Sequence, residues 1–567
     1  MLSKKQWLAA STDVQDVEHL EEVLGIPPVF CQLLAQRNIT SYEAARDFFR
    51  PEWAHLHDPF LMQDMHKAVA RLHAAIQDGE KILLYGDYDV DGTTSVAMMY
   101  SFLQPLHPHL DYYIPDRYKE GYGISFEGLD YAAANDIKLV IAMDCGIRAV
   151  AQVRAAQHHG IDFIICDHHL PETEIPAAVA VLDPKRGDCA YPYKELSGCG
   201  VAFKLAQAYV QNHDLSQDLL MDLLDLLAIS IASDIVPITG ENRVLTHLGL
   251  QALNRTRRPG LLALIERAKR ERPLSISDIV FGLAPMINAA GRLADADQAV
   301  KLMLAHNRKI AEDYARVLEH RNKLRKEFDQ RIAEEAAELF QEMPDWEDRR
   351  SIVLYQPHWH KGVVGIVASR MVEKFHRPSI ILTESGGKVV GSARSVRGYD
   401  VHQAIHSCED LLINFGGHTH AAGLTLAPEN LPYFQDRFEG YVSSTLTEDL
   451  MQPIQYYAAE LDFAQITPKF WRILHQFGPF GPGNRNPVFL TRGVTDTGYS
   501  RTLKKEHLHL SVQQKDSKVF SGVAFGRGSE AGKVLNREPF DLYYTLEENK
   551  WQGKRTLQLA VKDIVCR

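Results

Sequence analysis

The chain has 567 residues, a length that accommodates roughly three to four domains. Hydrophobic residues make up 45% and charged residues 24%, as in ordinary soluble globular proteins, and no apolar run is long enough for a transmembrane helix. The formal net charge of -11 argues against a general nucleic-acid coat protein, although an enzyme with a local basic cleft is compatible with it.

The N-terminal segment shows no sign of a targeting signal. It lacks the apolar region of a secretory peptide, and the seven cysteines form no CxxC pair. An odd, unpatterned set of cysteines favours the reducing cytoplasm over a disulfide framework. We therefore expect a cytoplasmic protein without membrane contact. Residues 1–70 are predicted to be a polar helical segment, in which we recognise no chemistry.

From residue 81 onward, short apolar runs alternate with helical patterns. This alternation predicts an α/β lobe with a parallel sheet covered on both faces. Ligands of such sheets bind beyond the carboxyl ends of the strands. The predicted strands are residues 81–86, 110–114, 138–143 and 162–166, and the predicted helices lie near 96–104, 126–135 and 147–159.

Three aspartates follow the first predicted strand: Asp87, Asp89 and Asp91 in Tyr-Gly-Asp-Tyr-Asp-Val-Asp-Gly. We expect them on a strand-to-helix turn, alternating along nearly extended backbone. Carboxylates this close repel one another, and hard oxygen ligands suit Mg²⁺ or Mn²⁺. The alternative is an acidic surface turn or aspartates that cap the helix. An EF-hand loop is excluded because its twelfth position would be Met98 instead of Glu.

Further acidic residues and histidines follow later apolar segments. Asp144 ends strand 138–143, Asp167-His168-His169 ends strand 162–166, and Asp234 ends the helix-rich stretch 219–231. Each one alone could be a helix cap or a structural histidine. Together they would converge at one edge of the sheet, and carboxylates with imidazole are the ligands expected of a two-metal phosphoryl-transfer site.

At these residues the chain resembles the DHH phosphoesterases, which are named for the Asp-His-His triplet. The resemblance implies two Mn²⁺ or Mg²⁺ ions, with Asp144 as the bridging ligand. Asp87 and His169 join the expected catalytic group, His169 beside the metals or facing the substrate. Many members carry His where this chain has Tyr85, so either one metal site is weaker or Asp87 substitutes as a ligand. The implied metal ligands are Asp89, Asp91, Asp144, His168 and Asp234.

Two more segments of this lobe are candidates for substrate contact. Loop 116–124 is basic, aromatic and glycine-containing and carries Arg117, although a solvated loop is equally compatible with it. Segment 281–293 places Asn288 and Arg292 among small residues beside a turn, and small residues let the backbone approach a ligand. Arg292 could hold a scissile phosphate through two N–H groups.

Residues 309–343 contain neither Pro nor Gly and are predicted to form one helix of about 50 Å, which connects the two lobes. Beyond it, glycine-rich turns are expected at 359–370, 391–395 and 416–423, each with a basic or hydroxyl donor. They resemble the DHHA1 domain that accompanies the DHH lobe. We expect Ser392 and Arg394, together with Arg117, to grip the terminal phosphate, and His418 to join Arg292 at the scissile phosphate.

The last 115 residues, 453–567, change to short alternating strands with a hairpin end at 549–554. A five-stranded OB-fold that binds single strands fits this pattern, and a purely structural barrel is the alternative. The basic and aromatic residues available for binding are Arg501, Lys504, Lys505, Lys550, Trp551, Lys554 and Arg555.

From about residue 70 to its end the chain resembles the bacterial single-strand-specific 5′→3′ DNA exonucleases within this superfamily. The resemblance implies hydrolysis of single-stranded DNA to 5′-mononucleotides in repair and recombination, with a single-strand DNA-binding protein and a RecQ-type helicase as partners. The alternatives are a phosphodiesterase for short oligoribonucleotides or cyclic dinucleotides, and a scaffold that binds nucleic acid without cutting it. The expected domains are a helical segment (1–70), the DHH domain (71–305), the connecting helix (306–345), the DHHA1 domain (346–452) and the OB-fold (453–567).

Overall fold

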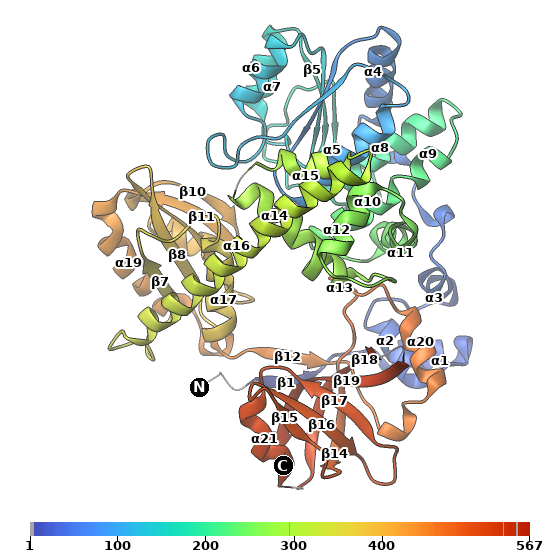
Figure 1. The fold of residues 1–567 in the computed structure, drawn as a ribbon, viewed down its shortest axis with the longest axis vertical. Coiled ribbons are helices and arrows are strands. Elements are labelled where there is room, and N and C mark those ends of the chain that lie inside the picture. Colours follow the sequence, from blue (N-terminus) through green and yellow to red (C-terminus); the bar gives the residue numbers. More distant parts are fainter. Residues whose placement is uncertain (1–4, 294, 537, 552–553, 567) are drawn as a thin grey trace.

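The computed structural model describes residues 5–293, 295–536, 538–551 and 554–566, without the side chains of residues 550, 551 and 554. Figure 1 shows three bodies: a blue-to-green α/β lobe, a yellow-to-orange α/β lobe linked to it by the long helix α16, and a red β module at which both chain ends lie. Among the described residues, no helix is both long and apolar enough to cross a membrane.

The first lobe contains the predicted parallel sheet, in the strand order β3-β2-β4-β5-β6. Helices α4, α5 and α8 cover one face, and α6 and α7 cover the other. The three-residue strand β6 was not predicted, because so short a run carries no periodic signal. The strands are β2 (Ile82–Gly86), β3 (Leu110–Tyr113), β4 (Leu139–Met143), β5 (Asp162–Cys166) and β6 (Ala180–Leu182). The helices are α4 (Met65–Gln77), α5 (Val90–Leu103), α6 (Phe126–Ala134), α7 (Val150–His158) and α8 (Gly198–Asn212).

A layer of helices continues this lobe. The predicted turn beside Asn288 and Arg292 is wrong: these residues lie within α14, directly after a π-helical segment at Ile279–Leu283. The small residues serve helix packing instead, since a Cβ at Gly291 would lie 2.4 Å from the carbonyl oxygen of Tyr88. The helices are α9 (Asp218–Met221), α10 (Leu224–Ser233), α11 (Gly240–Arg255), α12 (Pro259–Arg267), α13 (Ile276–Asp278), α14 (Ala284–Leu293) and α15 (Asp297–Met303).

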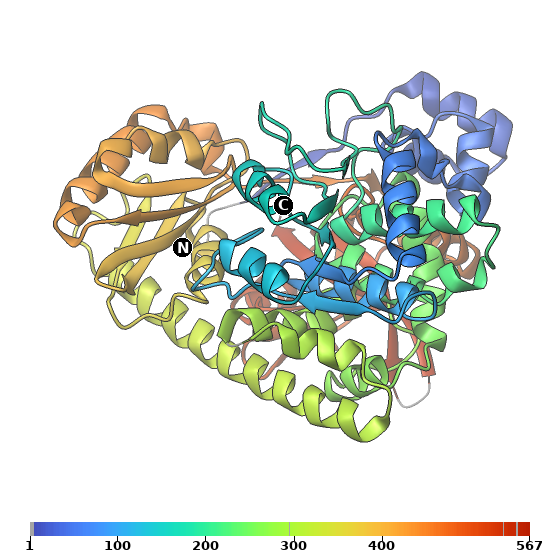
Figure 2. The same ribbon diagram turned by 90° about the horizontal axis from the view of Figure 1, so that it is seen from above.

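The predicted connecting helix is confirmed as α16 (Arg308–Gln341), which has 34 residues. Leu318 in its first half packs into the core of the first lobe, and Phe340 in its last turn packs into the second lobe. Figure 2 shows α16 running along one side of the molecule between these two bodies.

The second lobe is a five-stranded sheet in the order β10-β11-β9-β8-β7. The glycine-rich turn expected at 391–395 is wrong, because these residues belong mostly to strand β9. Gly391 permits close strand packing there, since its Cβ would lie 2.5 Å from the carbonyl oxygen of Ile381. Most of segment 416–423 likewise belongs to the hairpin strands β10 and β11. The elements are β7 (Ile352–Tyr355), α17 (Val364–Phe375), β8 (Ser379–Ser385), β9 (Lys388–Arg394), α18 (Val401–His406), β10 (Leu412–His418), β11 (Ala421–Leu426) and α19 (Leu431–Thr445).

The C-terminal module is a strongly curved sheet in the order β13-β14-β18-β19-β17-β16-β15. Strands β14 and β16 are joined by only two residue pairs, so the barrel is incompletely closed. The predicted hairpin is present between β18 and β19, although residues 552–553 at its tip and the side chains of Lys550, Trp551 and Lys554 lie outside the described residues. The elements are β13 (Ala459–Glu460), α20 (Pro468–Gln476), β14 (Phe489–Asp496), β15 (Arg501–Leu503), β16 (His507–Gln513), β17 (Phe520–Ala524), α21 (Ala531–Leu535), β18 (Phe540–Trp551) and β19 (Lys554–Cys566).

The N-terminal segment is attached to this C-terminal module. It is not purely helical, because β1 (Gln6–Ala9) pairs in parallel with β12 (Ile454–Tyr457), the strand that leads out of the second lobe. Its helices α1 (Val14–Leu24), α2 (Pro28–Ala35) and α3 (Tyr42–Phe49) share a hydrophobic core with the barrel. The two ends of the chain therefore fold together.

Candidate active site

The first motif is a helix start, and this corrects the expectation of three aspartates along extended backbone. Asp89 is the N-cap of α5, and its Oδ1 accepts hydrogen bonds from the backbone N–H groups of Asp91 (2.8 Å) and Gly92 (3.2 Å). Asp91 is already helical. Gly92 makes the tight turn possible, since a Cβ there would lie 2.3 Å from the carbonyl oxygen of Asp87. The capping alternative thus holds for Asp89, whose Oδ2 makes no hydrogen bond to a described residue.

Three hydrogen-bond donors hold the Asp91 carboxylate in place. Its Oδ2 accepts from the Gly198 N–H (2.6 Å), and its Oδ1 accepts from the Cys199 N–H (3.0 Å) and the Ser230 hydroxyl. The N-terminus of α8 and helix α10 therefore fix the orientation of this buried side chain. The sequence analysis named none of these donors. The signal that could have revealed them is the run of small residues 197–200 at the start of α8.

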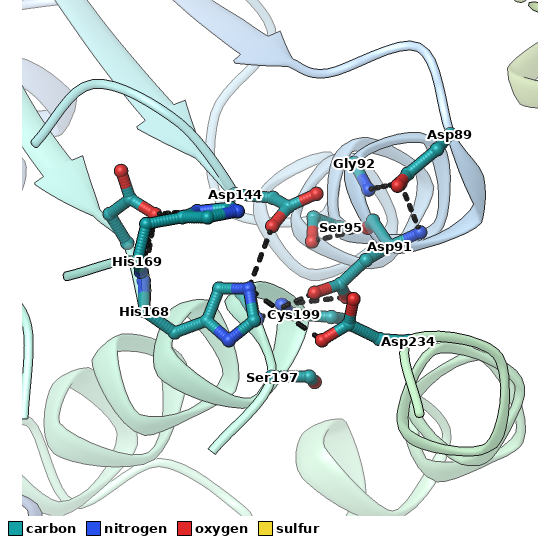
Figure 3. A network of polar contacts seen from close by, with 12 residues as sticks. Asp89, Asp91, Gly92, Ser95, Asp144, His168, His169, Ser197, Cys199 and Asp234 are labelled. Atoms are coloured by element: carbon teal, nitrogen blue, oxygen red, sulfur yellow. Dashed lines mark hydrogen bonds and ion pairs between the residues drawn. The ribbon is translucent and has the colours of Figure 1, made fainter. Parts of the chain in front are cut away.

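Asp144, His168 and Asp234 meet beside this helix start (Figure 3). The His168 Nε2 lies 3.2 Å from Asp144 Oδ1 and 3.6 Å from Asp234 Oδ2. Asp144 ends β4 in a left-handed conformation with φ of 60°. Asp144 packs directly against Gly198, and this close contact requires a glycine, because a Cβ at position 198 would lie 2.6 Å from the Asp144 Cβ. The carboxyl edge of the sheet thus brings together motifs that are far apart in sequence.

The donor atoms form overlapping groups suited to a metal ion. In each group the atoms lie within 4.8 Å of one another, and Asp144 belongs to two of them. Among the described residues, Asp87 Oδ1, both ring nitrogens of His168 and Asp234 Oδ2 are buried and make no hydrogen bond, because the close contacts of His168 Nε2 with the two carboxylates lack hydrogen-bond geometry. Such buried lone pairs are costly unless something satisfies them, and carboxylate oxygens with one imidazole suit Mn²⁺ or Mg²⁺. The groups are Asp87-Asp89-Asp144, Asp91-His168-Asp234 and Asp144-His168-His169.

The pKa values of these carboxyl groups and of His168 also indicate a metal site. Burial, followed by repulsion from neighbouring carboxylates, raises the pKa values of Asp87, Asp144 and Asp234 well above the usual range. Burial lowers the pKa of His168 to about 4, which leaves its ring neutral near pH 7. A cluster of acids that resists ionisation, next to a neutral imidazole, is stabilised in its metal-binding form by a divalent cation.

Asp167 braces this centre and lies outside the groups of potential ligands. Its Oδ1 accepts from the backbone N–H groups of His168 (2.7 Å) and His169 (3.2 Å) and lies 2.8 Å from His169 Nδ1, while its Oδ2 accepts from the Ile147 N–H. Burial opposes the charge on His169, but the contact with Asp167 outweighs it, so the pKa of His169 is raised. Tyr122, another residue not singled out from the sequence, donates to the Asp144 carbonyl at 2.9 Å.

A cluster of arginines adjoins the aspartates. The Arg117 guanidinium lies 4.7 Å from the ring centre of Tyr88, the residue between Asp87 and Asp89. Arg292 is half-buried, and its Nη1 donates to the Gly362 carbonyl at 3.3 Å. Burial and then the charge of Arg117 lower the pKa of Arg292 to about 10, and the same two causes lower that of Arg394. A concentration of positive charge of this kind suits a phosphate.

Ser392 and Arg394 join this cluster from the second lobe. Arg394 Nη1 donates to the Ser392 hydroxyl at 2.7 Å. A Cβ on Gly365 would lie 3.0 Å from Arg394 Nη2 and 3.1 Å from Ser392 Oγ, so both donors lie against the first turn of α17. We call Arg117, Arg292, Ser392 and Arg394 the phosphate cluster.

The remaining predicted residues lie elsewhere. His418 ends β10 and lines a pocket together with His169. Asn288 is half-buried on α14, and its side-chain amide makes no hydrogen bond to the described part of the chain. The Tyr85 hydroxyl bonds to the Gly123 carbonyl and to Ser125, so its side chain is engaged with the loop before α6.

The sheet, the helix-linked second lobe and the acidic centre define a DHH-type phosphoesterase. Residues 81–231 match the DHH family N-terminal domain, 348–444 the DHHA1 domain and 457–563 the RecJ OB domain. The chain is 36% identical to the single-stranded-DNA-specific exonuclease RecJ of Bacillus subtilis, over 99% of this chain and 71% of that protein. It is 34% identical to the protein of the same name from Escherichia coli, over 95% of this chain and 96% of that one. The chain therefore belongs to the RecJ family.

Solved structures of RecJ support this family assignment. The crystal structure of RecJ with Mn²⁺ from Thermus thermophilus superposes with a TM-score of 0.84 at 26% identity, covering 100% of this chain and 80% of that one. The corresponding Mg²⁺ complex gives 0.78 at 25% identity, with 100% and 78% covered.

Proposed function

We propose that this protein is a metal-dependent exonuclease that degrades single-stranded DNA in the 5′→3′ direction to 5′-mononucleotides. The observation that carries the proposal is the juxtaposition of two features. Overlapping groups of metal donors lie at the sheet edge. A phosphate cluster contributed by both lobes lies beside them. A terminal phosphate held by this cluster would place a nearby phosphodiester at the metal centre. The domain boundaries given above, with catalysis in 71–305 and strand binding in 453–567, are part of the proposal.

The residues divide the work in the following way. Asp87, Asp89, Asp91, Asp144, His168 and Asp234 would hold two divalent ions, with Asp144 shared between them. When bound, the ions supply the positive charge that a phosphoryl displacement requires. The hydrogen bonds to Asp91 and the brace of Asp167 fix the ligands beforehand. Arg117, Ser392 and Arg394 of the phosphate cluster would hold the terminal phosphate. Arg292 and His418 would contact the scissile phosphate, and His169 would face the substrate.

The length of the strand separates this proposal from its main alternative. Phosphodiesterases for short oligoribonucleotides or cyclic dinucleotides do not require a separate strand-binding module, whereas residues 457–563 match the RecJ OB domain. We therefore favour a long DNA strand as substrate. A cytoplasmic role in repair and recombination, with a single-strand DNA-binding protein and a RecQ-type helicase as partners, belongs to the same proposal.

The test uses oligonucleotides labelled at either end, incubated with Mn²⁺ or Mg²⁺. Wild type and Asp144→Ala are compared, and Asp130→Ala, an exposed aspartate on α6, is the control. We expect early release of 5′-labelled mononucleotide by wild type and the control, loss of release in Asp144→Ala, and no cleavage of blunt duplex. Release from the 3′ end first would contradict the polarity. Cleavage of RNA or cyclic dinucleotides without DNA would favour the alternative enzyme, and tight binding without cleavage would favour a scaffold.

A further inference from the structure

A pocket of about 410 Å³ adjoins the candidate active site; of the potential metal donors only His169 lines it, and no residue of the phosphate cluster does. Its floor is the turn between β4 and α7, and its rim includes His169 of the first lobe and His418 of the second. Its volume lies within the range of about 300–1,000 Å³ that is typical of pockets for small ligands. It is therefore large enough for a nucleotide unit.

The walls of this pocket combine apolar surface with polar side chains. Ile124, Ile147 and Ala149 are buried and supply an apolar side. Gln152 is half-buried and its amide makes no hydrogen bond to any described residue. Arg148 donates from its Nε and Nη2 to the Leu170 carbonyl, at 3.2 and 3.1 Å, and its Nε lies 3.7 Å from Glu172, yet its side chain is still 45% exposed. A nucleobase has this complementary chemistry, with apolar faces and a polar edge.

The position of the pocket assigns it to a particular nucleotide. The phosphate cluster lies beside Tyr88 at the Asp87 side of the metal donors, whereas the pocket borders Asp167 and His169 at the other side. Tyr122 stands between the two, with its ring edge-on to Tyr88 at 6.4 Å and to His169 at 5.5 Å. A strand that begins at the phosphate cluster and crosses the metal donors would reach this pocket next.

We propose that the pocket receives the base directly 3′ of the scissile phosphodiester, the second base of the strand, with Gln152 and Arg148 at its polar edge. This inference rests on the proposed function and adds a subsite to it. Because every nucleobase offers apolar faces and hydrogen-bonding groups, the pocket would require a base without strongly selecting among the four.

The test places a single abasic site at nucleotide 1, 2, 3 or 6 of a single-stranded oligonucleotide and measures kcat and KM for the first cleavage. We expect an abasic site at nucleotide 2 to raise KM by roughly tenfold, as expected for loss of one base contact, and at nucleotide 6 to have little effect. In Gln152→Ala and Arg148→Ala the penalty at nucleotide 2 should shrink toward that at nucleotide 6. Arg154→Ala, a surface residue on the same helix with a side chain 67% exposed, should keep the full penalty.

The possible outcomes test the base pocket separately from the proposed exonuclease function on which it rests. If wild type cleaves no DNA, the proposed function fails. If it cleaves but the penalty falls at nucleotide 1, or is equal at nucleotides 2 and 6, the inference is overturned while the function stands. It is also overturned if both variants keep the position-specific penalty, because a merely structural role would change activity equally on every substrate.

Discussion

At the scale of single residues, the metal centre depends on groups that orient the carboxylates. Asp91 illustrates this dependence, since two backbone N–H groups and one hydroxyl hold its carboxylate. The hydroxyl belongs to Ser230, which also lies 2.8 Å from the Ser197 hydroxyl at the cap of α8. Ser230 thus connects the ligand-bearing α5 with the start of α8.

We expect Ser230→Ala to weaken Mn²⁺ binding by about 10- to 100-fold, the usual effect of losing a group that orients a metal ligand. Calorimetric titration of the metal-free protein with Mn²⁺ measures the change. Ser101→Ala is the matched control, because Ser101 lies in α5 and its hydroxyl donates to the Ala97 carbonyl and accepts from Arg258, away from the acidic residues of the metal centre. Equal Mn²⁺ affinity in Ser230→Ala and the control would show that Asp91 does not need this hydroxyl.

Asp183 gives a pH-dependent prediction. It is fully buried after β6, and burial raises its pKa to about 7. Its Oδ1 accepts from the Lys185 N–H, and its Oδ2 has no hydrogen-bond partner in the described part of the chain. The folded protein keeps this proton up to a higher pH than the unfolded chain, whose carboxyl titrates near 3.9. Its contribution to the free energy of unfolding therefore falls by about 1.4 kcal/mol per pH unit as the pH rises from about 4 to about 7.

Asp183→Asn removes this titration. In metal-free protein, denaturant unfolding should give similar stabilities for wild type and variant near pH 4. At pH 8 the variant should be more stable by up to about 4 kcal/mol. Buried neighbours titrate in both proteins, so the difference between the two curves isolates Asp183. A difference that does not change between pH 4 and pH 8 would rule out the raised pKa.

At the scale of elements, strong periodic signals in the sequence predicted the strands and the long helix well. The apolar runs at β2, β4 and β5 lie within one residue of their predicted bounds. Where the pattern failed, contacts between distant parts of the chain determine the local structure. Segment 391–395 was expected to be a turn, yet most of it lies in strand β9, where Gly391 leaves room for the neighbouring strand β8. The orientation of the Asp91 carboxylate depends on Gly198 and Cys199, which are more than 100 residues away in sequence.

The candidate site was predictable to a similar degree. The order of strand ends sufficed to gather Asp144, His168 and Asp234, whereas partners such as Ser230 and Tyr122 could be recognised only from the packed structure. The phosphate cluster spans two lobes, so its geometry depends on the rigidity of α16 between them.

We expect Lys323→Pro in the middle of α16 to impair catalysis without loss of metal binding. Lys323 is exposed and lies between the halves of the helix that pack into the two lobes. Proline there costs about 3 kcal/mol and kinks the helix, which would move Ser392 and Arg394 away from Arg117. KM for DNA should rise roughly tenfold or more, since a charged hydrogen bond contributes about 1.5–3 kcal/mol. The Mn²⁺ affinity should not change, because all candidate ligands precede α16.

Lys323→Ala keeps the helix and is the control. Circular dichroism would establish that the proline variant remains folded. If Lys323→Pro matched wild type in both KM and kcat, the phosphate cluster would not depend on a straight connecting helix.

At the scale of the whole molecule, the catalytic lobe, the N-terminal helices and the barrel module meet at one buried arginine. Arg243, on α11, is 4% exposed and lies 3.7 Å above the ring of Phe48. Its guanidinium donates to the carbonyl of Phe48 at the end of α3, and to those of Gln476, Phe477 and Gly478 at the end of α20. The last carbonyls of a helix lack partners within the helix, so a cation is favourable there.

Arg243→Ala should therefore destabilise the protein and separate its parts. Burial lowers the pKa of Arg243 to about 9, so the side chain remains charged at neutral pH and every one of these donors is lost in the variant. We expect a loss of about 3 kcal/mol or more, because buried carbonyls of two helix ends lose their donors together. Calorimetry should show the barrel module, with the N-terminal helices that share its core, unfolding apart from the catalytic lobe.

Arg255→Ala, an exposed arginine at the end of the same helix, should leave the transition unchanged. A single transition shared by wild type and Arg243→Ala would mean that the connecting helix and β12, rather than this junction, hold the modules in one cooperative unit.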